Sequence, residues 1–191
     1  AKKIFSQNGF NDVIRTVSGK LENIDWKALD LPTQYDVIIS EWMGYFLLYE
    51  GMVDTVLYAR DHYLKPNGNL LPNKSKMFFA AISDSDCFER NVDFWNDVYG
   101  FKMSSLIKDV VSEALVDQID GTHICSSTET ILELDILQCA SNSVLCVNSS
   151  FDLKFEQTST IHAFIGWFDC YFEGMGKSVV LTTSPFAEPT H

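Results

Sequence analysis

The 191-residue sequence lacks most of the short motifs that identify a cofactor or a metal. It has no Gly-x-Gly-x-x-Gly loop for a dinucleotide and no Gly-x-Ser-x-Gly turn for a nucleophilic serine. Its four histidines show no His-x-x-x-His spacing, so we expect no metal site. Its five cysteines are odd in number and have no Cys-x-x-Cys spacing, which favours free thiols in a reducing compartment over a disulfide framework.

Basic residues are also scarce, since 14 Lys and Arg stand against 26 Asp and Glu, for a net charge of −12. An acidic chain is repelled by nucleic-acid phosphates, so we expect no direct nucleic-acid binding. The charge fits attraction of a cationic partner, although simple solubility explains it equally well. No apolar run approaches the roughly 20 residues of a membrane span, and we expect neither a signal peptide nor membrane association. We expect a cytoplasmic location, with the nucleus as a second one.

The first part of the chain alternates strand-like and helix-like segments, which predicts an α/β fold. Strands are expected at 13–17 and 35–40, and a helix at 52–64 that ends in a turn at 65–68. The chain begins without methionine in what reads as the end of a helix, and it stops directly after a strand. We therefore expect a fragment of a longer protein.

After Pro72 the pattern changes to period-two alternation, which predicts an antiparallel sandwich or barrel. The expected strands are 77–82, 132–136, 151–155, 160–172 and 178–183. An insertion at 88–112 is too aromatic for a solvated loop. It is either a packing element of the local core or an arm that buries its apolar face on a second subunit.

The most informative segment is 40–50, Ser-Glu-Trp-Met-Gly-Tyr-Phe-Leu-Leu-Tyr-Glu. Glu41 follows a predicted buried strand, at the edge of the sheet where open α/β folds bind ligands. Glu50 precedes the predicted helix, whose dipole favours a negative charge. The two acids lie among aromatic residues (Trp42, Tyr45, Phe46 and Tyr49), and this arrangement predicts a receptor for a planar cation. Glu50 alone has an ordinary alternative as a helix-start charge. Glu41 is harder to explain in that way, because it follows an apolar strand and an unpaired buried carboxylate is costly.

This segment resembles the double-E loop of the protein arginine N-methyltransferases. The resemblance continues in the right order through Tyr58-Ala59-Arg60, 95–101, and Thr183-Ser184-Pro185 with Thr190-His191. The segments 95–101 and 168–173 carry the finer similarity within the family. Within the family the chain is most similar to the third member, a type I enzyme. The resemblance implies the carboxyl-terminal part of a Rossmann-like S-adenosylmethionine domain at 1–71. It also implies a partial β-barrel at 72–191, with a helical dimerisation arm at about 88–112.

The resemblance also implies roles for individual residues. Glu41 and Glu50 would hold the substrate guanidinium, Glu22 would contact the cofactor adenine, and Leu21 would add a backbone contact. His191 matches a histidine of a Thr-His-Trp loop and is, with Glu50, a candidate proton acceptor. Met52 would lie near cofactor and substrate. The remaining implied substrate contacts are Trp42, Met43 and Tyr45.

The implied activity is methyl transfer from S-adenosylmethionine to arginine side chains of proteins, giving mono- and asymmetric dimethylarginine. The implied substrates are Gly/Arg-rich basic proteins such as RNA-binding proteins, ribosomal proteins and histones, and the implied assembly is a homodimer formed through the arm. The family's glycine-rich cofactor loop and ribose-binding acid have no counterpart in 1–191. We therefore expect this chain alone to bind cofactor weakly and to be inactive. The alternative is a non-catalytic truncated isoform or dimerising scaffold.

Overall fold

A computed structural model of the chain describes residues 1–140, 144, 146–174 and 176–188. The helices are α1 (Lys2–Gln7), α2 (Val53–Tyr63), α3 (Ser85–Asn91) and α4 (Ile107–Ser112), with 3-10 turns η1 (Leu21–Asn23), η2 (Asp93–Asn96), η3 (Ser104–Leu106) and η4 (Gly121–His123). The strands are β1 (Tyr35–Ile39), β2 (Leu64–Leu71), β3 (Lys74–Ile82), β4 (Glu129–Asp135), β5 (Ala163–Phe172) and β6 (Val179–Thr182).

The first part of the chain forms a parallel β1–β2 pair joined through α2. Parallel strands need a crossover connection, and α2 supplies it. The helix buries Val53, Val56 and Leu57, which recur at the spacing that places residues on one helix face. The predicted strand at 35–40, the helix at 52–64 and the α/β class are thereby confirmed.

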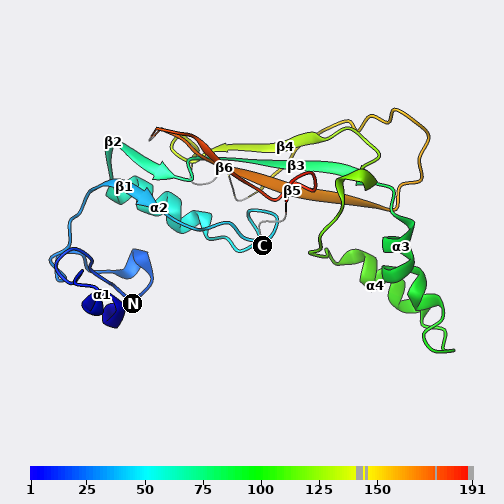
Figure 1. The fold of residues 1–191 in the computed structure, drawn as a ribbon, viewed down its shortest axis with the longest axis horizontal. Helices are drawn as coiled ribbons and strands as arrows, with labels where there is room; N and C mark the ends of the chain where they lie inside the picture. The colour runs from blue at the N-terminus through cyan, green and yellow to red at the C-terminus, as the bar shows by residue number, and fades with distance from the viewer. Residues whose placement is uncertain (141–143, 145, 175, 189–191) are drawn as a thin grey trace.

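The second part is a four-stranded antiparallel sheet in the order β4-β3-β5-β6. In its register Met77 lies opposite Leu132 on one side and Phe168 on the other. Figure 1 shows this sheet running along the length of the molecule, with β1, β2 and α2 toward one end and α3 and α4 at the other. The antiparallel architecture predicted for this part is confirmed.

Among the described residues, a hydrophobic core joins the two parts. Its buried members come from the segment after β1, from α2 and β2, and from one face of the antiparallel sheet: Trp42, Leu47, Val53, Val56, Leu57, Leu70, Met77, Leu134, Ile136, Phe168 and Cys170. Arg60 of α2 adds a polar link, because its Nη1 donates to the carbonyl oxygens of Ile136 at 2.6 Å and Cys139 at 2.8 Å. The segment 40–50 is therefore held between helix and sheet.

The insertion at 88–112 folds as short helical turns that project from the end of the sheet (Figure 1). The Asp84 side chain caps α3 by accepting a hydrogen bond from the Cys87 N–H at 2.9 Å. The Met103 N–H donates to the Trp95 carbonyl at 3.1 Å and so ties the two halves of the projection together. Tyr99 is 91% exposed and Phe101 is 73% exposed, so these two residues are not part of a local core.

Three local predictions were wrong. Residues 13–17 form no strand, because no neighbouring strand pairs with them and the chain turns there through the Val13 and Ile14 N–H bonds to the Phe10 carbonyl. Residues 151–155 also form no strand, and the Lys154 backbone exchanges hydrogen bonds with Ser127, which precedes β4. Residues 65–68 lie within β2 rather than in a turn.

Among the described residues, no helix is both long enough and apolar enough to cross a membrane.

Candidate functional site

The segment 40–50 is a closed loop rather than an extended connection. The Ser40 N–H donates to the Leu71 carbonyl at 3.1 Å, which fixes the start of the loop to the end of β2. The Gly44 N–H donates to the Leu47 carbonyl at 3.0 Å, and the two residues form a β-bridge. Phe46 and Leu47 have φ values of 46° and 64°, in the left-handed region. That conformation costs about 1–2 kcal/mol per residue, and burial of Leu47 at 1% exposure offsets it with about 1.5–3 kcal/mol.

The loop separates its apolar and polar side chains. Trp42, at 1% exposure, lies in the core with Leu47, whereas Tyr45 is 60% exposed. Both acids, Glu41 and Glu50, are exposed. Trp42 was predicted to contact substrate, and its burial gives it a structural role that the sequence pattern did not indicate. Glu41 and Glu50 therefore lie on the solvent side of the loop, and Trp42 and Leu47 hold its other side in the core.

Gly44 allows Glu50 to fold back over the loop. A Cβ atom on Gly44 would lie 2.8 Å from Cγ, 2.9 Å from Cβ and 3.0 Å from the backbone N of Glu50. These distances are shorter than any ordinary van der Waals contact, so only a glycine leaves room for Glu50 here. The backbone φ of Gly44 is not in the left-handed region, so the requirement is one of space. Glu50 therefore lies directly on the part of the loop that follows Glu41.

Glu22, the predicted cofactor residue, lies against the helix that follows this loop. The Thr55 hydroxyl in the first turn of α2 donates to Glu22 Oε1 at 3.1 Å. A hydrogen bond from its own backbone N–H, together with that from Thr55, holds the pKa of the Glu22 carboxyl below its usual range, against the opposing effect of burial. Its Oε2 is enclosed and has no hydrogen-bond partner among the described residues, and Lys20 Nζ is 4.0 Å away. Buried carboxylate oxygens without a hydrogen-bond partner are uncommon in folded proteins, so this acceptor calls for a further explanation.

The other predicted site residues lie around this arrangement. Met52 is the residue before α2 and is 43% exposed, next to the acid loop in sequence. Met43 and Leu21 are half-buried, and Leu21 begins η1, which contains Glu22. The structure therefore brings Glu22 close to the start of the helix that Glu50 and Met52 precede. His191 lies outside the described residues.

Several contacts that shape the site carried no signal in the sequence. Thr55 contacts Glu22 across 33 positions, and the Arg60 guanidinium reaches the Ile136 carbonyl across 76 positions. The ring of Phe46 lies against the backbone of Gly166 in β5. None of these contacts follows from local spacing, because each depends on how helix, loop and sheet pack.

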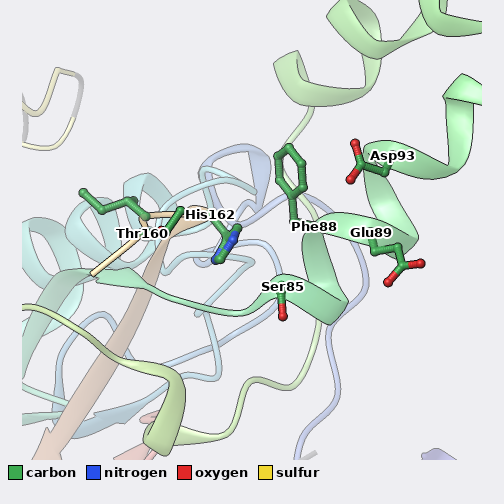
Figure 2. Close-up of a pocket in the computed structure, with 7 residues that line it drawn as sticks. Ser85, Phe88, Glu89, Asp93, Thr160 and His162 are labelled. Carbon is green, nitrogen blue, oxygen red and sulfur yellow. The ribbon is translucent and has the colours of Figure 1, made fainter. Parts of the chain in front are cut away.

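Two surface hollows lie away from the acid loop. One, of about 510 Å³, lies between α3 and the segment before β5 and is lined by Ser85, Phe88, Glu89, Asp93, Thr160, Ile161 and His162 (Figure 2). The rings of Phe88 and His162 are 5.7 Å apart there. The second, of about 460 Å³, includes Arg60, Leu64 and Asn67. Neither hollow includes Glu22, Glu41 or Glu50, and the candidate site rests on the chemistry of these acids rather than on the depth of a cavity.

Within the part of the chain that the structure describes, no cluster of three or more His, Cys, Asp or Glu side chains could hold a metal ion. All five cysteines are free.

Comparison with known proteins gives one matching family model, described as the arginine methyltransferase oligomerization subdomain, over residues 73–191. The chain is 42% identical over 192 residues to protein arginine N-methyltransferase 1 of Schizosaccharomyces pombe, covering 100% of this chain and 55% of that protein. It is 43% identical over 192 residues to protein arginine N-methyltransferase 1 of Dictyostelium discoideum, covering 100% of this chain and 54% of that protein. The chain therefore spans about half the length of the curated relatives it matches.

Two solved structures have the same fold. The Trypanosoma brucei PRMT1 enzyme-prozyme heterotetrameric complex with AdoHcy superposes with a TM-score of 0.89 at 34% identity, covering 100% of this chain and 58% of that one. Arabidopsis thaliana protein arginine methyltransferase 10, in an open conformation, gives a TM-score of 0.76 at 28% identity, covering 97% and 59%.

Proposed function

Because the chain belongs to the arginine methyltransferase family, we propose that the protein carrying it transfers methyl groups to guanidino nitrogens of arginine residues in other proteins. The observation that carries the proposal is the closed loop with Glu41 and Glu50 exposed and Glu50 folded over Gly44. A loop that is anchored through Trp42 and Leu47 can hold its acids in place while a ligand binds. Such anchoring reduces the entropy lost on binding.

The two acids suit a guanidinium in particular. Arginine stays cationic at neutral pH, with a pKa above roughly 12, and presents planar N–H donors. Carboxylates bind that planar group through charge-assisted hydrogen bonds. We propose that Glu41 and Glu50 hold positive charge on one side of the guanidinium and leave the target nitrogen free to attack. The proton lost during transfer would pass to Glu50 or to a base that involves His191.

S-adenosylmethionine, the proposed methyl donor, supplies an electrophilic methyl group on its sulfonium. The residues present fit this group, because Glu22 Oε2 is an enclosed acceptor without a hydrogen-bond partner among the described residues. Glu22 would accept a hydrogen bond from the adenine, Leu21 would add a backbone contact, and Met52 would lie near the reacting groups. Holding two reactants in line contributes about 7–11 kcal/mol to lowering a barrier.

The finer assignments are part of the same proposal. We propose a type I enzyme that gives asymmetric dimethylarginine on Gly/Arg-rich basic proteins, with a cytoplasmic and nuclear location. Oligomerisation through the exposed apolar surface at Tyr99 and Phe101 agrees with the name of the matching subdomain. Both curated relatives described above are named protein arginine N-methyltransferase 1, so they do not support the finer similarity to the third member. The division into parts at 1–71 and 72–191 remains a prediction.

A titration separates this function from the scaffold alternative. S-adenosylhomocysteine is titrated by calorimetry into residues 1–191 and into the longest natural protein that carries them. We expect binding by the longer protein, weakened at least tenfold by Glu22→Gln and unchanged by the matched surface change Glu156→Gln. If neither protein binds, the cofactor proposal fails and the scaffold becomes the better explanation.

A methylation assay tests the roles of the acids. The longer protein is incubated with S-adenosylmethionine and a Gly/Arg-rich peptide, and the products are identified by mass spectrometry. Glu41→Gln and Glu50→Gln should each lower kcat/KM by at least about 100-fold, the usual effect of removing one group that stabilises charge in a transition state. Retention of full activity by both variants would contradict the proposed site.

A further inference from the structure

One contact joins the acid loop directly to the antiparallel sheet. The ring of Phe46 lies on the backbone of Gly166, which is opposite Phe79 in the β3–β5 register. A Cβ atom on Gly166 would lie 2.5 Å from Cζ and 3.1 Å from Cδ2 of Phe46, and closer still to Cε2. Ordinary carbon contacts are about 3.5–4.0 Å, so no other residue fits beneath the ring where it now lies.

The glycine is required by this contact and not by its backbone conformation. Gly166 is absent from the positive-φ glycines among the described residues, so any L-residue could adopt its extended backbone. Glycine within a strand is destabilising relative to alanine, and an interior strand glycine often marks a place where another group approaches closely. At Gly166 the group that approaches is Phe46, 120 positions earlier in the chain.

The loop constrains the backbone of Phe46, whereas the ring itself is 41% exposed. Phe46 has a left-handed backbone and is followed by Leu47, which is 1% exposed in the core. The Leu48 N–H donates to the Phe46 carbonyl at 2.7 Å. A displacement that reaches the Phe46 backbone would therefore shift the turn that pairs Gly44 with Leu47. Because Glu50 lies on Gly44, such a shift reaches the carboxylate.

We propose that Gly166 is a positioning residue for the acid pair, acting through the ring of Phe46. The inference rests on the proposed arginine methyltransferase function. Besides the shared core, loop and sheet meet at this size-matched contact, in which the loop supplies the large ring and the strand position has no side chain. A smaller residue at position 46 is then expected to compensate for the loss of activity that a larger residue at position 166 causes.

A double-mutant cycle tests this in the longest natural protein that carries the chain. The variants are Gly166→Ala, Phe46→Ala and the combination of both, with Phe155→Ala as the control because Phe155 and Phe46 are equally exposed at 41%. Steady-state methylation is measured with a Gly/Arg-rich peptide and S-adenosylmethionine, with thermal unfolding measured alongside. Gly166→Ala should lower kcat/KM for the peptide at least tenfold and leave the KM for S-adenosylmethionine within about twofold. The double variant should recover to within about threefold of wild type.

The outcomes distinguish this inference from the function on which it depends. Two outcomes overturn the positioning role alone. In the first, wild type is active and Gly166→Ala is fully active as well. In the second, the kcat/KM of the double variant is no higher than that of Gly166→Ala. An equal rise in the KM for S-adenosylmethionine and for peptide indicates general disruption and also overturns it. A wild-type protein without methylation activity overturns the proposed function, and this inference with it.

Discussion

The close contact between Gly44 and Glu50 makes Gly44→Ala the most direct test of the acid loop. The added Cβ would lie 2.8 Å from Glu50 Cγ and 3.0 Å from its backbone N. An ordinary contact is about 3.5 Å or more, so Glu50 must move by at least about 0.5–0.7 Å. The side chain could rotate, but the backbone N cannot move without displacing the start of the segment that leads into α2.

The structure gives the expected size of the effect. A misplacement of about 1 Å costs on the order of 100-fold in rate, and each tenfold loss corresponds to about 1.36 kcal/mol of barrier. We therefore expect Gly44→Ala to lower kcat/KM for a Gly/Arg-rich peptide by about 30- to 100-fold, or about 2–3 kcal/mol. Overpacking costs about 1–3 kcal/mol of stability, so the variant should remain folded.

The assay compares methylation kinetics and thermal unfolding of wild type, Gly44→Ala and the control Gly9→Ala. Gly9 has a φ of 72°, and no atom lies within 4 Å of an added Cβ, so its substitution strains the backbone far from the loop without steric contact. We expect Gly9→Ala to lower the unfolding temperature slightly and to leave kcat/KM unchanged. A Gly44→Ala variant that keeps wild-type kcat/KM would refute the argument that Glu50 depends on this contact.

Three further predictions concern groups outside the loop. The fold lowers the pKa of the Glu22 carboxyl, so ionised Glu22 stabilises the protein at pH values above the ordinary glutamate range. This stabilisation is lost as the pH falls through the lowered pKa. The difference in unfolding temperature between wild type and Glu22→Gln should therefore shrink from pH 6 to pH 3. Arg60→Ala removes charged hydrogen bonds to the Ile136 and Cys139 carbonyls and should lower the free energy of unfolding in urea by about 2–4 kcal/mol. Substitution of the exposed Arg90 by Ala should change it by no more than about 0.5 kcal/mol. Equal effects would contradict the linking role of Arg60. Burial raises the pKa of the Cys170 thiol to about 11, so iodoacetamide at pH 8 should leave it unmodified while the protein is folded, as mass spectrometry of the labelled peptides can show.

The sequence by itself determined the local elements and the chemistry of the loop. The apolar run in β1 and the helical spacing in α2 are local patterns, and local patterns predict the elements that they build. The two acids within 40–50 were sufficient to predict a cation receptor. The negative charge of a glutamate follows from its residue type and needs no knowledge of the fold. The failures at 13–17 and 151–155 have one cause, which is that a strand exists only where a neighbouring strand pairs with it.

Only the tertiary structure decided how the site is held. The pattern that predicted Trp42 as a binding surface could not show that the core takes it up, because burial depends on segments far away in the chain. The contact between Phe46 and Gly166 and the hydrogen bond between Thr55 and Glu22 arise from the packing of the loop and of the α2 helix. Residue types thus determined which charges the chain carries, and long-range packing determined where those charges lie. The reason is that the free energy of burial comes from apolar surface that many segments contribute together to the core.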